Sequence, residues 1–484
     1  MRSYARNLTG EYPRLAVMSN LRAKAFQHSK TGTTSRVWTE IDGSELWFES
    51  DDIDLNPSTE ALGTLWLIPA LLSNRNLEID QAICATWYQN AHKIIDFLGR
   101  FWGTKPIEII ANQVTVNAES DVDAVSRIDA VSRIDTISRI DTVSGIDTVS
   151  GADVVSRSAF SEAGGVSGRG NGLFFTCGTD SFYTLLTNPV PEFLIYLETF
   201  DVPSDETRAK IARERLEKVA RAVGSKPIVI RTNTKKHPTF NAHRLGDTHS
   251  SFLAAVGHLL SPHMVSITIS PSWHKTHHEV TGSNWRLDPL WSSASLQVIH
   301  GDSTALRSQR VKEIADNEIV QGNLHVCFEN YNCSRCEKCV RTMVELELAG
   351  KLNDCKTFDT KVSLIQRIDD LPIVRDPKFF EETLNKTLEP KIEEAIIRMF
   401  RRGILAQTEI ENQLKMRRYV DDQFPKIEAG LKNALHHYRL LQENHEKLLQ
   451  DYKALSEKRP LRRGAKAVRH LLKMLRDKRE RHSK

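Results

Sequence analysis

Apolar and polar residues alternate on both sides of an Asp-Gly pair near the start of the chain. Residues 37–41 and 46–49 each follow this alternation, and Asp42-Gly43 is a typical two-residue turn, so the pattern predicts a β-hairpin. Helices are predicted over about 58–72 and 78–102, where apolar residues recur every three or four positions. With a further strand expected at 106–111, we interpret residues 1–115 as a small N-terminal α/β region.

From residue 172, short apolar runs alternate with amphipathic stretches. The expected strands are 173–176, 193–199, 227–231, 264–269 and a weaker 296–299, and the expected helices are 180–186, 204–223 and 247–260. This alternation predicts an α/β fold with a parallel sheet and helices on both faces. Sheets of this type bind ligands at the carboxyl ends of their strands.

A tandem hexapeptide separates these two regions. Aspartate recurs at every sixth position from 123 to 153, with an apolar residue at every third position. A β-solenoid needs several stacked coils and caps, and six hexads are too few. We therefore interpret residues 116–171 as a disordered, repeat-containing insertion and linker, followed by a domain over 172–356.

The C-terminal third is predicted to be helical. A helical region over 357–426 precedes a coiled coil over 427–457, and a basic amphipathic tail follows over 458–484. Apolar residues of the coil alternate steps of four and three, with one polar position, His445. The seam comprises Ile427, Leu431, Ala434, Tyr438, Leu441, His445, Leu448, Tyr452 and Leu455.

Composition and charge indicate the kind of chain and the partners to expect. The 484 residues are 40% hydrophobic and 26% charged, which is typical of a soluble globular chain. The tail has 12 Lys and Arg against two acidic residues, whereas the rest of the chain has 54 basic and 60 acidic residues. Nucleic acid or an anionic membrane surface is therefore expected at 458–484. No secretory signal or membrane span is recognised, so a cytoplasmic protein is expected.

The first expected strand of the 172–356 domain leads through a polar loop into a helix. The loop is Thr176-Cys177-Gly178-Thr179-Asp180-Ser181. Loop amides and the positive end of the helix would face one point, which favours phosphate binding. Gly178 permits a tight turn, and Asp180 and Ser181 could cap the helix, hold a metal or contact phosphates. The alternative is an ordinary strand-to-helix turn with a capping side chain.

Four of the seven cysteines fall within 13 residues, as Cys327-x5-Cys333-x2-Cys336-x2-Cys339. Zinc takes four thiolates tetrahedrally, and two-residue gaps bring consecutive sulfurs around one ion. With no coordination position left for water, such a site would be structural. An iron–sulfur cluster or four unliganded thiols are the alternatives.

Several polar residues are weaker candidates. Histidines at a strand end could meet a substrate or a metal, but a His-rich surface loop is the preferred interpretation. Asp247 and His249 at a helix start suit capping, and Asp288 suits either a site or a turn. The strand-end group is His274, His277, His278 and Glu279.

The loop resembles the Ser-Gly-Gly-x-Asp-Ser motif of the N-type ATP pyrophosphatases, the PP-loop superfamily with a HUP-type fold. Gly178, Asp180 and Ser181 match, Thr176 replaces the first Ser, and Cys177 stands where the motif has its first Gly. The cysteine run resembles the zinc knuckle of 7-cyano-7-deazaguanine synthase and follows the loop in the same order. Residues 283–292 and 332–343 resemble an uncharacterised branch related to that family, and the resemblance covers about 172–350.

This resemblance implies an ATP-dependent, ligase-type adenylating enzyme. ATP would be held by residues 176–181 with Mg²⁺ at Asp180, Asp180 and Ser181 would be catalytic, and the zinc would be structural. A carboxylate or amide oxygen of a small molecule would be activated, with release of pyrophosphate, for attack by nitrogen or sulfur.

Two alternatives stay open. One is a tRNA- or nucleoside-modifying thiolase of the same superfamily, with Cys177 carrying sulfur. The other is a catalytically degenerate, zinc-stabilised scaffold that dimerises through 427–455 and rests its tail on a membrane surface.

Overall fold

The computed structural model describes residues 20–115, 169–198, 200, 206–243, 245–276, 280–371, 380, 383, 388–422 and 427–457. The chain divides into two compact units between Arg310 and Val311. This boundary lies inside the domain that the sequence suggested over 172–356. The hexapeptide repeat and the basic tail lie outside the described residues, so their predicted roles stay predictions.

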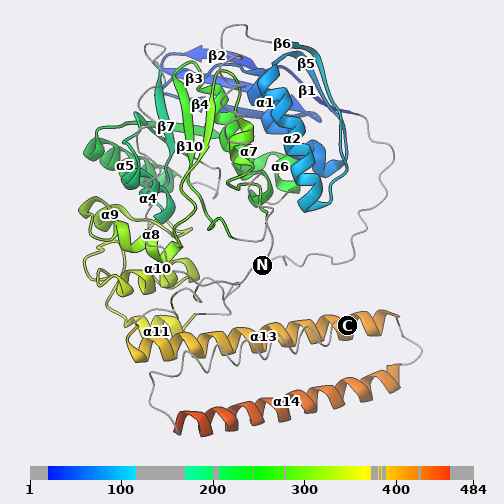
Figure 1. Ribbon diagram of the computed structural model, residues 1–484, viewed down its shortest axis with the longest axis vertical. Coiled ribbons are helices and arrows are strands. Elements are labelled where there is room, and N and C mark those ends of the chain that lie inside the picture. The colour runs from blue at the N-terminus through cyan, green and yellow to red at the C-terminus, as the bar shows by residue number, and fades with distance from the viewer. Residues whose placement is uncertain are drawn as a thin grey trace, which may run out of the picture. The chain divides into compact units, whose positions relative to one another are not determined.

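The first unit contains an eight-stranded sheet in the order β11-β10-β7-β8-β9-β4-β3-β2 (Figure 1). Five neighbouring strands are parallel, as the strand–helix alternation predicted. They are β7 (Gly170–Phe174), β8 (Phe193–Glu198), β9 (Lys226–Thr232), β10 (Met264–Ile269) and β11 (Gln297–His300). The prediction of an α/β fold with a parallel sheet is therefore confirmed.

The predicted hairpin extends this sheet. Strands β3 (Thr34–Ile41) and β4 (Ser44–Ser50) pair antiparallel, and Asp42 and Gly43 between them both have positive φ, as a tight two-residue hairpin turn requires. β2 (Gln27–Thr31) pairs with β3 at the edge, and β4 pairs antiparallel with β9. The N-terminal region thus shares a sheet with the strands after residue 169.

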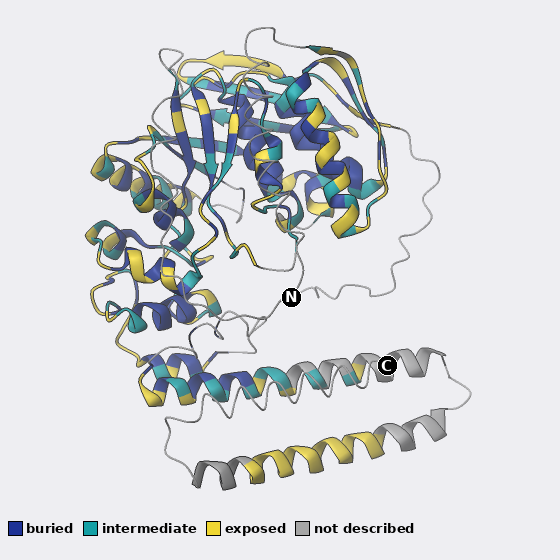
Figure 2. Cartoon of the chain, in the orientation of Figure 1, coloured by how far each residue is buried: buried dark blue, intermediate teal, exposed yellow. Residues whose placement is uncertain are grey.

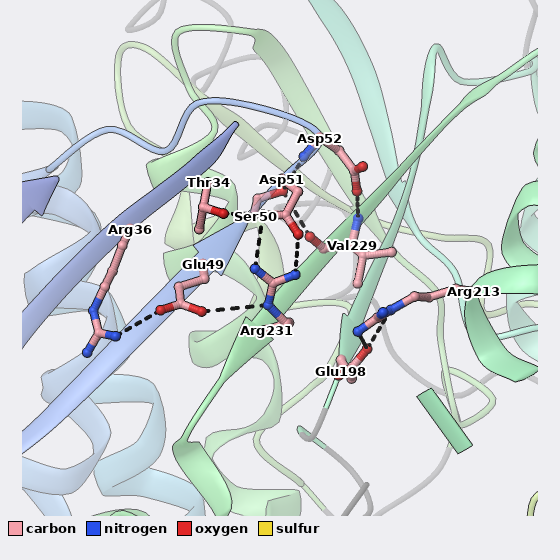
Figure 3. Close-up of polar contacts among 10 residues, drawn as sticks. All are labelled: Thr34, Arg36, Glu49, Ser50, Asp51, Asp52, Glu198, Arg213, Val229 and Arg231. Carbon is pink, nitrogen blue, oxygen red and sulfur yellow. Dashed lines mark hydrogen bonds and ion pairs between the residues drawn. The ribbon is translucent and has the colours of Figure 1, made fainter. Parts of the chain in front are cut away.

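Side-chain bonds reinforce the junction of β4 with β9 (Figure 3). Arg231 donates from Nη1 to Asp51 Oδ2 at 2.6 Å and also lies 3.6 Å from Glu49. The Val229 amide donates to Asp52 Oδ2 at 2.8 Å. These bonds connect β4 and the two residues that follow it to strand β9 of the parallel sheet.

A second sheet of the first unit corrects one prediction. β1 (Leu21–Ala23), β5 (Leu77–Cys84) and β6 (Ile109–Thr115) form three parallel strands. The helix expected over 78–102 is therefore wrong in its first turns, because 77–84 is a strand and α2 spans Ala85–Trp102. Ile83 has helical spacing to Trp87 but belongs to β5, where pairing with β6 outweighs the local pattern.

Helix α7 (Leu245–Leu259) covers one face of the large sheet, and α1 (Thr59–Ser73) packs against α7. Helix α1 is capped by Ser58, whose Oγ accepts from the Ala61 amide at 3.1 Å, and residues 61–71 are all buried (Figure 2). Gly257 of α7 lies against Ile267 of β10. A side chain at position 257 would overlap Ile267, so glycine permits this close packing.

Helix α5 (Glu206–Val223) lies on the other face. Its Arg213 donates to Glu198 Oε2 at 2.8 Å, while the preceding Leu197 joins the core with α7. Successive strand residues point to opposite faces, so α5 and α7 cover opposite sides of β8. Shorter elements complete the unit: α4 (Thr179–Thr187), η2 (Thr234–Lys236), α6 (Pro238–Ala242) and η3 (Asp288–Trp291).

The second unit is helical. α8 (Arg307–Ile314) begins before the boundary, and α9 (Glu318–Asn323), α10 (Glu337–Leu348), α11 (Leu364–Asp369), α13 (Pro390–Asp422) and α14 (Ile427–Glu457) follow. Arg398 of α13 bonds Asp369 of α11 at 2.7 Å. No helix within the described residues is both long enough and apolar enough to cross a membrane.

Candidate functional site

The loop between β7 and α4 lies at the carboxyl edge of the parallel strands and follows the central one of the five. Cys177 adopts φ +58°, the left-handed conformation that favours glycine, whereas Gly178 has φ −79° and is extended. The tight turn expected at Gly178 is therefore made by Cys177. This is the position at which the resembled motif has glycine.

The backbone amides of the first turn of α4 face the 176–181 loop. Among the described residues, no side chain caps its N-terminus, and the first amides of a helix have no partner within the helix. Ser181 Oγ donates to the Gly178 carbonyl at 3.1 Å and lies 3.4 Å from the Thr176 amide. Ser181 thus holds the loop closed and leaves the amides of the first turn available for an anion.

Two arginines of α8 reach the start of α4. Arg310 is buried and donates to Asp180 Oδ1 at 2.9 Å and to the Pro271 carbonyl at 2.5 Å. Arg307 donates to Thr179 Oγ1 at 3.0 Å, and its Nη1 lies 3.7 Å from Asp180 Oδ1. Both guanidinium groups thus lie beside the first turn of α4, at the helix end that favours anions. Sequence reasoning missed both residues.

A cavity of about 170 Å³ opens beside the loop. A dry cavity of roughly 150 Å³ is known to accept benzene, so this one has room for a ring. Its polar wall includes Ser270, whose buried Oγ has no hydrogen-bond partner within the described chain. The walls comprise Phe174, Phe175, Thr176, Gly178, Asp180, Ser181, Ile195, Leu197, Phe200, His249, Leu253, Ile269, Ser270 and Ser272.

Part of the wall of this cavity is aromatic. His249 of α7 packs on Phe200 with ring centroids 5.6 Å apart, and Phe200 stacks on Phe252 at 4.6 Å. Flat apolar surfaces of this kind suit a heterocyclic ring. Capping was the preferred interpretation of His249, and the structure places it in the cavity wall instead.

The Cys177 side chain does not block the cavity. The residue is 4% exposed and, of loop residues 176–181, Cys177 and Thr179 do not line the cavity. Burial raises the pKa of the Cys177 thiol to about 12. A thiol so protonated at neutral pH is a poor nucleophile.

A buried acid–histidine pair lies one strand from the cavity. Asp288 is fully buried, and its Oδ2 accepts from Ser283 Oγ at 2.9 Å and lies 2.7 Å from His300 Nδ1. Its Oδ1 accepts from the Asn284 amide at 3.0 Å. His300 pairs with Ile269 of the cavity wall, so both side chains point to the same face of the sheet. Asp288 therefore fixes both a turn and a histidine at the ligand edge.

The remaining histidine candidate belongs to the loop structure. His274 Nδ1 lies 2.7 Å from Thr276 Oγ1, and its Nε2 lies 2.8 Å from the Thr304 carbonyl. Both ring nitrogens are thus occupied in holding the loop. His277, His278 and Glu279 lie outside the described residues.

The four clustered cysteines converge in the second unit. The sulfurs of Cys327, Cys333, Cys336 and Cys339 all lie within 4.8 Å of one another. The Cys327–Cys336 and Cys333–Cys339 sulfur pairs are 3.8 and 3.9 Å apart. Tetrahedral zinc with sulfurs at about 2.3 Å separates its ligands by about 3.8 Å, so the cluster could hold such an ion.

The backbone around the cluster favours thiolates. The Glu329 amide donates to Cys327 Sγ at 3.4 Å, and the Cys336 amide donates to Cys333 Sγ at 3.3 Å. Hydrogen bonding from Cys339 lowers the pKa of Cys336 to about 5, whereas the same contact raises that of Cys339. A cation at the centre would relieve this competition for charge by stabilising all four thiolates.

Comparison with protein-family models, curated proteins and solved structures gave no match.

Proposed function

We propose that the first unit is an ATP-dependent adenylating enzyme of the PP-loop type. The observation that carries this proposal is the meeting of three features at one sheet edge. The uncapped start of α4, the two arginines of α8 and a ring-sized cavity all adjoin the 176–181 loop. Together they offer anion donors beside an apolar chamber, which matches the two halves of a nucleotide.

Different residues of the site would bind different parts of the nucleotide. First-turn amides of α4, with Arg307, would hold the β- and γ-phosphates, and the wall of Phe200 and His249 would take the base. Asp180, which shares its charge with Arg310, is the carboxylate that would hold Mg²⁺, and a bound Mg²⁺ would neutralise phosphate charge. Catalysis would rest on positioning and charge neutralisation.

The proposed reaction has two steps. A carboxylate or amide oxygen of the substrate attacks the α-phosphorus, and the bond to the β-phosphate oxygen breaks to release pyrophosphate. A nitrogen or sulfur nucleophile then displaces AMP and loses a proton. The buried state of Cys177 disfavours the alternative in which this thiol carries sulfur.

ATP–Mg²⁺ titration by calorimetry tests the proposal. Arg307→Gln should weaken binding about tenfold or more, since a charged hydrogen bond is worth about 1.5–3 kcal/mol. Lys312→Gln, an exposed change on the same helix, is the control and should bind as the wild type does.

A Cys177→Gly variant distinguishes a working ATP site from one that the cysteine has inactivated. It should bind ATP like the wild type, because the side chain does not line the cavity. Absence of binding by both proteins would overturn the proposal and favour a scaffold. Binding by Cys177→Gly alone would mean that the cysteine has inactivated an ancestral site.

A further inference from the structure

Helix α14 has apolar side chains that nothing described in the structure covers. Every side chain from Leu435 to Asp451 is exposed (Figure 2). Leu435 and Tyr438 are 54% and 57% exposed, and Leu448 is 41% exposed. A single helix gains most of its stability from packing an apolar face, so α14 requires a covering partner.

Most of the apolar and charged residues of α14 occupy different heptad positions. With Tyr438 and His445 at a, Leu441 and Leu448 fall at d, and Leu435 and Leu449 fall at e. The charged residues of this stretch fall at b, c and f, apart from Asp451 at g. Those four are Arg439, Glu443, Glu446 and Lys447. Apart from Leu440 at c, the exposed large apolar side chains of this stretch lie on one side of α14, and most of its charges lie on the opposite side, as in a coiled-coil strand.

Most of the large apolar side chains described in the other long helix, α13, are already buried. Ile392, Ile396, Met399 and Phe400 of α13 are buried, and the Arg398–Asp369 bonds attach this part of α13 to α11. Among the large apolar side chains described in α13, Leu405 alone is classed as exposed, at 48%, so this helix offers α14 little apolar surface.

We propose that α14 pairs with α14 of a second copy of this chain in a parallel, two-stranded coiled coil. This inference does not depend on the proposed ATP chemistry. No like charges would oppose each other between g and e positions of the described stretch. The facing pairs would be His437 with Gln442 and Asn444 with Leu449 of the other copy.

The buried area is sufficient for a stable dimer. Covering a leucine-sized side chain removes roughly 60–120 Å² of apolar surface, at about 25 cal/mol per Å². Five such residues at a, d and e in each copy give about 600–1,200 Å² in total. The sequence repeat continues to Ile427 and Leu455, which takes the seam into the range of about 1,200–2,000 Å² of stable interfaces.

His445 specifies the alignment. Identical a residues face each other across a parallel, in-register coil, so His445 would meet only its own copy. In any shifted register each histidine would lie against apolar side chains, and two polar layers would form. A single polar layer therefore favours the parallel arrangement.

Light scattering on the full-length protein tests the pairing. The wild type should have the mass of two chains at micromolar concentration. A Leu441→Glu, Leu448→Lys variant should have the mass of one chain, whereas the control Glu443→Lys, Lys447→Glu should stay dimeric. Both variants keep the net charge. Unchanged circular dichroism in the near ultraviolet would show that the α/β unit remains folded.

A monomeric wild type would overturn the proposal and would indicate instead that α14 folds back on the same chain. A dimer that survives the Leu441→Glu, Leu448→Lys change would place the interface elsewhere and would also overturn it.

Cysteine cross-linking tests the register. Mild oxidation should join two copies of Leu441→Cys by a disulfide, because d residues face each other in a parallel dimer. Glu443→Cys, on the outer face, is the control and should give no added cross-link. Absence of a cross-link at 441 in a protein that remains dimeric would contradict the parallel alignment.

Discussion

At Cys177 an unfavourable backbone conformation is opposed by favourable burial of the side chain. Its left-handed backbone costs about 1 kcal/mol or more for a residue with a Cβ, while its buried thiol gains from leaving water. The backbone geometry is the one that glycine would adopt. Having cysteine where the resembled motif has glycine therefore does not prevent this loop conformation.

Asp288 is the residue on which the 283–288 turn depends. Asp288→Ala would leave the His300 ring, the Ser283 hydroxyl and the Asn284 amide without their acceptor in a buried setting. We expect a loss of about 3 kcal/mol in unfolding free energy, measured by urea denaturation.

The matched control is Asp80→Ala, which removes a half-exposed carboxylate from the same unit. That variant should lose less than about 0.5 kcal/mol. Equal losses in the two variants would show that the bonds of Asp288 add no stability.

At the scale of elements, the cysteine cluster joins a loop to the start of α10. Purified protein should contain about one zinc per chain, and Cys336→Ser should lose the metal and unfold the second unit. A structural zinc contributes on the order of 10 kcal/mol to folding, which is comparable with the whole stability of a domain.

Cys355→Ser is the control for this measurement, because Cys355 is a buried cysteine of the same unit that lies outside the cluster. It should retain the metal. Metal loss from both variants would indicate general unfolding, and metal retention by Cys336→Ser would contradict the assigned ligands.

The junction of β4 with β9 predicts an acid-sensitive contribution to stability. Hydrogen bonding from Arg231 and Thr34 lowers the pKa of Asp51 from its usual 3.8 to about 2 (Figure 3). Because the folded state holds the proton less tightly, the ion pair stabilises the fold above pH 4, and this contribution is lost as the pH falls toward 2.

Asp51→Asn should therefore cost about 1 kcal/mol at neutral pH, a value reduced for solvent screening of this half-exposed carboxylate. Urea unfolding of both proteins at pH 7 and pH 2 measures the difference, which should be much smaller at the lower pH. A constant difference across this range would contradict the assignment.

At the scale of the whole molecule, the first unit has one hydrophobic core built from distant segments. Leucines and Trp66 of α1 pack with α7, which lies more than 170 residues later in the chain. A fragment starting at residue 169 should therefore fail to fold. Losing several buried side chains at about 1.5–3 kcal/mol each exceeds the stability of about 5–15 kcal/mol of a typical domain.

Circular dichroism and amide hydrogen exchange on fragments 169–310 and 20–310 would measure this dependence. The longer fragment should be folded and protected from exchange. A protected 169–310 fragment would show that the parallel strands are independent of the N-terminal elements.

The sequence by itself determined the features that depend on neighbours along the chain. Strand β10 begins and ends where its apolar run predicts, α1 begins after its capping serine, and the Cys-x2-Cys-x2-Cys spacing predicts the sulfur cluster. Periodicity and short spacings report which residues are buried or brought together within a few turns.

Only the tertiary structure decided how distant elements meet. It attached the hairpin to β9, made 77–84 a strand between β1 and β6, and brought Arg307 and Arg310 to a loop some 130 residues earlier. It also turned the Cys177 side chain out of the cavity. These results depend on pairing and packing between segments that no local pattern connects, because the free energy that selects them is gained only when the whole core forms.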